Sequence, residues 1–196
     1  MLKKRFNNLF PIIIDLETTG TNPNEDAILE IALITIKYKL NNIYPNKIIH
    51  YHIDPFKILN FNKKSLDFNK IIPFHPFRYA ISEHEALTNI FNFIKKEIAL
   101  TKFKKSILIG HNIYFDLSFL NSAIKRNNIK KNPFHTFTYL DTSTLGLLIF
   151  KEHILYKILK KANIKSNSKD FHSALYDAMK TAELFCNIIN KYDKKI

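Results

Sequence analysis

The sequence contains one cysteine and no long apolar run, and each shortage excludes a class of protein. The single cysteine, Cys186, cannot form an internal disulfide framework, which is typical of a protein in a reducing compartment. No segment approaches the ~20 consecutive apolar residues that cross a bilayer. The apolar stretch behind the basic N-terminus is interrupted by Asp15 and is too short for a secretory signal. We therefore expect a soluble, cytoplasmic protein without a membrane segment.

Acidic residues are also few, with 17 against 30 basic residues, and the formal net charge is +13. A surplus of this size attracts polyanions such as nucleic acid, and it makes their binding salt-dependent. However, 27 of the basic residues are lysines and 3 are arginines, and the chain also contains 30 isoleucines and 21 asparagines. Codon drift in an AT-rich genome produces the same mixture, so the charge is compatible with a nucleic-acid ligand without requiring one.

The length of 196 residues and the hydrophobic fraction of 46% are sufficient for one substantial core. We expect residues 1–196 to form a single domain. Apolar runs and turn residues predict an antiparallel meander followed by a further strand, and a capping box at Ser82 and Glu85 predicts a helix start. The expected strands are 11–15, 27–39, 48–53 and 106–110, and the expected helices begin after Ser82, at Asp116 and at Ala174. This order predicts an α/β fold with a mixed β-sheet flanked by helices.

Two carboxylates follow the first expected strand, in P-I-I-I-D-L-E. Asp15 and Glu17 are two residues apart, so on a strand both side chains leave by the same face and can share a cation. A solvated strand edge explains this spacing as well. The preceding run of isoleucines favours the metal interpretation, because an unpaired carboxylate at the end of a buried strand is costly to desolvate.

Two further segments carry acidic residues. Asp116 ends G-H-N-I-Y-F-D at an expected helix start, where the helix dipole alone favours a carboxylate. In F-H-S-A-L-Y-D, Ser173 is a candidate N-cap that leaves His172 on the loop and Asp177 in the first turns, leaning back toward it. A surface histidine beside a surface helix is the alternative for this pair. Together the segments offer four carboxylates, and oxygen ligands suit Mg²⁺ ions, two of which ~4 Å apart stabilise phosphoryl transfer.

The three motifs, in this order, resemble the exonuclease motifs of the DEDD superfamily, in the branch with a histidine in the third motif (DEDDh). N-P-F-H, F-T-Y-L-D-T and T-A-E-L-F-C-N-I-I-N extend the resemblance over nearly the whole chain to the bacterial ribonuclease T family. That family has a ribonuclease H-like fold, is dimeric and Mg²⁺-dependent, and removes nucleotides from the 3′ ends of transfer RNA, ribosomal RNA and other small stable RNA precursors. The resemblance implies a homodimer that acts on RNA ends. We expect single-stranded DNA to be cut as well, because nothing in the motifs distinguishes DNA from RNA.

The resemblance also implies the roles of the motif residues. Four carboxylates are expected to hold two Mg²⁺ ions, or Mn²⁺ in their place, and His172 is expected to take a proton from the water that attacks the terminal phosphodiester. General-base catalysis of this kind contributes ~10²–10⁴-fold, and the product is a nucleoside 5′-monophosphate. The implied metal ligands are Asp15, Glu17, Asp116 and Asp177.

Substrate contacts are implied at aromatic and basic positions. Three phenylalanines match positions where the family stacks the 3′-terminal bases, a contact worth roughly 1–3 kcal/mol per base. Two lysines match a nucleic-acid-binding segment that serves the partner's active site in the dimer. Thr21 and Lys64 depart from the family pattern, where a phenylalanine and a glutamate are expected. The implied contacts are Phe68, Phe115, Phe137, Lys105 and Lys130.

Two other functions are compatible with the motifs. A DNA exonuclease of the proofreading type has similar first and third motifs, and nothing in the motifs themselves reads a 2′-hydroxyl. A non-catalytic nucleic-acid-binding module is the alternative from another class. Such a module has no use for clustered carboxylates facing a polyanion, so the complete set of motif residues favours an enzyme.

Overall fold

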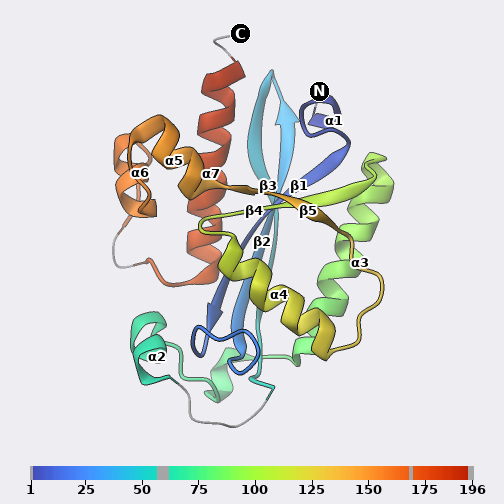
Figure 1. Cartoon of the computed structure of the whole chain (residues 1–196), viewed down its shortest axis with the longest axis vertical. Coiled ribbons are helices and arrows are strands. Elements are labelled where there is room, and N and C mark those ends of the chain that lie inside the picture. The colour runs from blue at the N-terminus through green and yellow to red at the C-terminus, as the bar shows by residue number, and fades with distance from the viewer. Residues whose placement is uncertain (1, 57–61, 168–169, 194–196) are drawn as a thin grey trace.

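A computed structural model describes residues 2–56, 62–167 and 170–193 (Figure 1). Its centre is a five-stranded sheet with the strand order β3-β2-β1-β4-β5. The strands are β1 (Leu9–Thr18), β2 (Ile28–Lys39), β3 (Asn42–His52), β4 (Lys105–Gly110) and β5 (Phe134–Asp141). The helices are α1 (Leu2–Arg5), α2 (Lys63–Asn69), α3 (Glu83–Thr101), α4 (Tyr114–Arg126), α5 (Thr142–Phe150), α6 (Leu155–Lys161) and α7 (Ala174–Asp193), with a 3₁₀ turn at Pro76–Arg78.

The sheet is mixed, as the order of elements predicted. Strands β1, β2 and β3 pair antiparallel as the expected meander, whereas β4 runs parallel to β1 and β5 runs parallel to β4. The sequence analysis did not identify β5. Only Phe134 of this edge strand is buried, so F-H-T-F-T-Y-L-D lacks the apolar run that marks a covered strand.

Helices cover both faces of the sheet, and Figure 1 shows α7 on one side and α3 and α4 on the other. Ile13 of β1 packs in one core cluster with Ala178 and Phe185 of α7. The neighbouring Ile12 packs in a second cluster, on the face covered by α3 and α4, with Phe119. Because side chains alternate along a strand, odd-numbered positions at this end of β1 point toward α7. Asp15 and Glu17 therefore leave by the α7 face.

Helix α7 also supports α5 and α6. Ile158 and Leu159 of α6 pack against Leu184 and Ile188 of α7 in a third apolar cluster. The inner face of α7 is buried at Ala178, Ala182 and Phe185, whereas Tyr192 is 54% exposed. It lies in the last turn, where the ring packs under the Arg5 guanidinium instead of the sheet.

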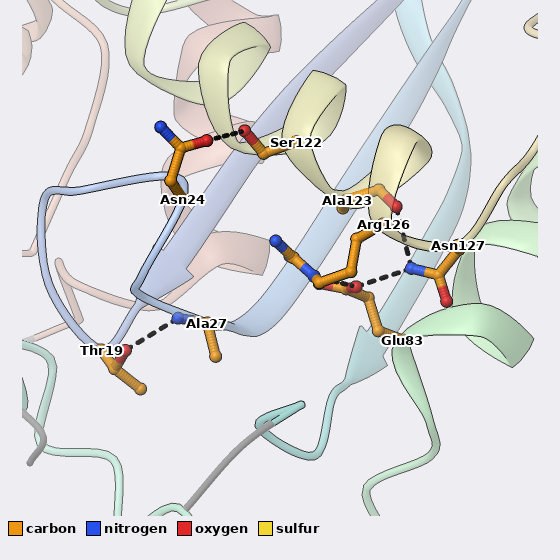
Figure 2. Close-up of polar contacts among 8 residues, drawn as sticks. All are labelled: Thr19, Asn24, Ala27, Glu83, Ser122, Ala123, Arg126 and Asn127. Carbon is orange, nitrogen blue, oxygen red and sulfur yellow. Dashed lines mark hydrogen bonds and ion pairs between the residues drawn. The ribbon is translucent and has the colours of Figure 1, made fainter. Parts of the chain in front are cut away.

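Helix α4 is fixed at its C-terminal end by a partly buried ion pair (Figure 2). Arg126 donates two hydrogen bonds to Glu83 of α3, at 3.0 and 2.7 Å, and Asn127 Nδ2 donates to the same carboxylate at 2.6 Å. Midway along the helix, Ser122 Oγ donates to Asn24 Oδ1 of the β1–β2 loop at 3.4 Å. These contacts hold α4 against α3 and against the loop that follows β1, so the first turn of α4 keeps its place beside the end of β1.

The start of α3 follows the predicted capping pattern. Ser82 Oγ accepts a hydrogen bond from the backbone N–H of Glu85 at 3.2 Å. The apolar stripe behind it is buried at Leu87, Ile90 and Ile94.

In the described part of the chain, no helix combines the length and the apolar character needed to span a membrane.

Candidate active site

The three predicted segments meet at one place. Asp15 and Glu17 lie near the C-terminal end of β1, and Asp177 lies in the first turn of α7, which covers that face. One carboxylate oxygen from each of these residues lies within 4.8 Å of the other two. Asp116, in the first turn of α4, is 4% exposed and accepts a hydrogen bond from the backbone N–H of Leu16. The structure thus brings together all four predicted carboxylates.

Crowding and burial make this cluster electrostatically unfavourable without a counterion. Burial, and then the charges of Asp116, Asp177 and Glu17, raise the pKa of Asp15 well above its usual value. Burial raises the pKa of Glu17 to about 8 and that of Asp177 to about 6, with neighbouring carboxylates adding to both shifts. Burial also raises the pKa of Asp116. A divalent cation removes this cost, because it favours the ionised form of every carboxylate it touches.

The ligand set fits a hard divalent cation. Asp177 Oδ2 accepts the backbone N–H of His172 at 3.0 Å. Its other oxygen, Oδ1, is buried and has no hydrogen-bond partner within the described residues. A buried, bare carboxylate oxygen beside two further carboxylates is an all-oxygen ligand set, which suits Mg²⁺ or Mn²⁺ rather than softer metals.

His172 lies just before α7, as the position of Ser173 predicted, and it adopts a left-handed backbone conformation with φ 75°. Its ring packs on that of Phe68, with 3.8 Å between the ring centroids. Burial, and then the nearby charge of Lys70, lower the pKa of His172. The imidazole is therefore neutral near pH 7, which is the form that accepts a proton.

A hollow of about 880 Å³ is lined by Asp15, Glu17, Asp177 and His172, whereas the buried Asp116 is not part of its lining. Phe68 is 61% exposed in its wall, and Phe115 lines the hollow half-buried, with its ring 4.8 Å from that of Phe119. Thr21 and Lys64, the two departures from the family pattern, also line it. The hollow thus combines acidic oxygens, a neutral imidazole and two accessible aromatic rings.

The other three predicted contacts lie outside this hollow. Phe137 is 87% exposed on β5, where it and Lys105 line a second hollow of about 1120 Å³. Lys130 is exposed in the link between α4 and β5. Within one chain these residues do not line the hollow with the carboxylates, and their role in substrate binding stays a prediction.

The sequence analysis missed several residues of the site. Asn69 donates a side-chain hydrogen bond to Glu17, and its Nδ2 also donates to the Thr18 carbonyl at 3.0 Å. In the sequence, the only indication that Asn69 belongs to the site was its position next to the predicted stacking residue Phe68. His111 directly follows β4, within the motif G-H-N-I-Y-F-D. Its Nδ1 lies 3.0 Å from Thr142 Oγ1, which is within hydrogen-bond distance. The remaining unpredicted residues in the wall of the hollow include Asn62, Ser65, Asn112, Tyr156 and Phe171.

Comparisons with known proteins agree with this geometry. A family model described as an exonuclease matches residues 12–185. Ribonuclease T of Buchnera aphidicola is 46% identical over 97% of this chain and 88% of its own length, and ribonuclease T of Vibrio parahaemolyticus is 45% identical over 97% and 90%. Among solved structures, a full-length 3′-exonuclease matches with a TM-score of 0.72 at 17% identity, covering 93% of this chain and 82% of that one. Escherichia coli exonuclease I bound to dT13 matches with a TM-score of 0.69 at 16% identity over 95% and 42%, so both structures support the fold alone.

Proposed function

The chain belongs to the exonuclease family and, within it, to the ribonuclease T group, and from this premise we propose that it is a 3′-to-5′ exoribonuclease dependent on Mg²⁺ or Mn²⁺. The proposed substrates are the 3′ ends of transfer RNA, ribosomal RNA and other stable RNA precursors. The proposed products are nucleoside 5′-monophosphates. The observation that carries this proposal is the convergence of carboxylates from β1 and α7 in one hollow, with the buried Asp116 of α4 near enough for its charge to raise the pKa of Asp15.

We assign the metal-holding role to Asp15, Glu17, Asp116 and Asp177. When bound there, two divalent ions supply electrostatic stabilisation for the oxygens that attack and leave the phosphorus. The chain's own contribution begins with His172, whose neutral ring accepts a proton from the attacking water. The ring stands at the rim of the hollow, held by Phe68 and by the turn that leads into α7.

Phe68 and Phe115 are placed to bind the end of the nucleic acid. Both rings line the hollow, and stacking on an aromatic ring holds any base without reading its hydrogen-bonding edge. An unpaired RNA end can splay its bases onto such rings, whereas the bases of an A-form duplex remain stacked on one another. This favours short 3′ overhangs beside duplex stems as substrates.

The proposal extends to a cytoplasmic homodimer. Phe137, Lys105 and Lys130 lie away from the hollow of their own chain, and in a homodimer a partner can present them to RNA. The second hollow is also lined by Lys104, which together with Lys105 offers positive charge to a phosphate backbone, whereas Arg5 in the same lining is paired with Asp193.

A labelled transfer RNA tests the activity directly. With Mg²⁺ present, a 3′-labelled transfer RNA with an unpaired end should release its label as mononucleotide, because the hollow accepts a free end. Parallel reactions with single-stranded DNA and RNA of one sequence should show cleavage of both, since base stacking and phosphate contacts do not require a 2′-hydroxyl. Label that is retained, or that first appears in internal fragments, would refute an exonuclease acting from the 3′ end.

Phe68→Ala should weaken substrate binding more than catalysis. Loss of one stacked base costs roughly 1–3 kcal/mol, so KM for a short RNA should rise about 5-fold to 150-fold. The His172 ring should also lose the contact with the Phe68 ring. Steady-state kinetics on a short single-stranded RNA measure this effect. Phe77→Ala is the matched control, because Phe77 is 76% exposed and does not line the hollow. Equal KM values for the two variants would rule out stacking on Phe68.

A further inference from the structure

Glu30 is a buried carboxylate beside the acidic cluster that belongs to none of the three motifs. It lies in β2, directly opposite Glu17 in β1 and His52 in β3. Residues directly opposite each other in a sheet share a face, so the Glu30 side chain points toward α7, as do Asp15 and Glu17. With an exposure of 4%, Glu30 requires partners from the protein.

Three donors satisfy this carboxylate, and two of them belong to the start of α7. His50 Nε2 lies 2.6 Å from Glu30 Oε1, and Ser173 Oγ donates to the same oxygen at 3.2 Å. The backbone N–H of Ala174 donates to the carboxylate as well. The first N–H groups of a helix lack partners within the helix, and a negative charge near them is favourable. Glu30 thus supplies, from a distant strand, the contact that a local N-cap normally makes.

The pKa of Glu30 is shifted in the opposite direction to the pKa values of the four carboxylates in the cluster. Burial acts to raise its pKa, but the hydrogen bond and charge of His50 and the Ala174 amide outweigh burial, and the pKa of Glu30 is lowered. Glu30, His50 and His52 also offer ligand atoms within 4.8 Å of one another. However, the 2.6 Å contact to His50 and the two donors from α7 already occupy the Glu30 carboxylate. The protein itself satisfies this group.

The residues that Glu30 holds lie between two members of the candidate active site. Ser173 and Ala174 are two of the four residues between His172 and Asp177, and the backbone N–H of His172 closes this turn onto Asp177 Oδ2. A displacement of Ser173 or Ala174 therefore moves both the imidazole and the carboxylate of α7 relative to β1.

We propose that Glu30, held by His50, is a positioning residue for the nuclease reaction: it ties the first turn of α7 to the sheet and so sets His172 and Asp177 against Asp15 and Glu17. This inference rests on the proposed function for its kinetic effect. Its structural part, the anchoring of α7 by a β2 carboxylate, is measurable without substrate or metal.

Substitution of His50 tests the proposal while every carboxylate remains in place. His50→Leu removes the donor to Glu30, whereas His50→Gln retains an N–H donor. With saturating Mg²⁺, kcat of His50→Leu on single-stranded RNA should fall about 10-fold to 100-fold, the usual effect of losing an outer partner of a metal site. KM should change less than about threefold, and His50→Gln should recover most of kcat. A kcat for His50→Leu close to that of the wild type, or an equal loss in His50→Gln, would overturn the proposal.

Hydrogen exchange supplies a readout that does not depend on activity. In metal-free protein, amides of residues 172–178 should exchange faster in Glu30→Gln and His50→Leu than in the wild type, because the start of α7 loses its anchor. Glu97→Gln is the matched control, since it removes another buried carboxylate, which pairs with the exposed Lys47 at 2.7 Å and does not line the hollow. Unchanged exchange in residues 172–178, or equally fast exchange in Glu97→Gln, contradicts the anchoring role. An inactive wild type would refute the proposed function, whereas the exchange result would still decide the role of Glu30.

Discussion

Asp15→Asn should reduce exonuclease turnover by about 10³-fold or more while leaving the affinity for RNA in EDTA nearly unchanged. Asp15 is placed where its carboxylate can share cations with Glu17 and Asp177, and an amide is a much weaker ligand for a hard cation. Electrostatic stabilisation by bound metal contributes several kcal/mol to the transition state, and each 1.36 kcal/mol is a factor of ten in rate. RNA affinity without metal depends on lysines and aromatic rings, which this substitution does not change. Mononucleotide release and fluorescence anisotropy measure the two quantities.

The same variant should make the metal-free protein more resistant to heat. Burial, and then the neighbouring carboxylates, raise the pKa of Asp15, so in the metal-free fold this group must either take up a proton or keep an unfavourable charge, and a neutral isostere avoids both costs. Asp67→Asn is the control, because Asp67 is exposed on α2 outside the hollow. It should change neither turnover nor the melting temperature. If Asp15→Asn retained the activity of the wild type, the assignment of Asp15 as a metal ligand would be wrong.

Removal of divalent metal should abolish turnover and make folding stability fall as pH rises. In the metal-free fold the pKa of Asp177 is raised from 3.8 to about 6 and that of Glu17 from 4.5 to about 8. The folded state therefore holds protons that the unfolded chain has already released. A group whose pKa is higher in the folded state stabilises the fold fully at pH values below its pKa in the unfolded chain. This contribution is lost as the pH rises through its pKa in the folded state. The loss should extend from about pH 4 to pH 8 and amount to roughly a few kcal/mol.

Melting curves at fixed pH, with EDTA and with Mg²⁺, measure this effect. The stabilisation produced by Mg²⁺ should increase from pH 5 to pH 8, because the metal must displace protons from the carboxylates at the lower pH. The melting temperature in EDTA is subtracted from that in Mg²⁺ at each pH, which cancels the effect of the +13 net charge on stability. Asp15→Asn should show a smaller difference at every pH. A difference that stays constant between pH 5 and pH 8 would show that these carboxylates are not the metal ligands.

Local chemistry in the sequence predicted much of this site. The two-residue repeat of a strand placed Asp15 and Glu17 on one face, and the structure has both on the face covered by α7. The helix start near residue 174 predicted that His172 precedes α7 and that Asp177 lies in its first turn. These predictions succeeded because they depend on neighbouring residues, whose geometry follows from backbone periodicity.

Predictions about contacts across the fold were less complete. Ser173 was expected to cap α7 locally, but its hydroxyl donates to Glu30, a residue 143 positions away. The edge strand β5 was missed, since an exposed strand carries no buried apolar pattern. Phe137 was grouped with the base-stacking positions by resemblance, but within one chain it lines a different hollow, together with Lys105.

By itself, the sequence determined which residues are candidates for the site and which way their side chains leave the backbone, because strand and helix periods set the direction of each side chain from its immediate neighbours. Only the tertiary structure decided how the motifs are held relative to one another. Strand register places Glu30 opposite Glu17, and the packing of α7 on that face brings Ser173 to Glu30 and Asp177 to Asp15. Register and helix packing depend on contacts between residues far apart in the chain, so a local pattern does not encode them.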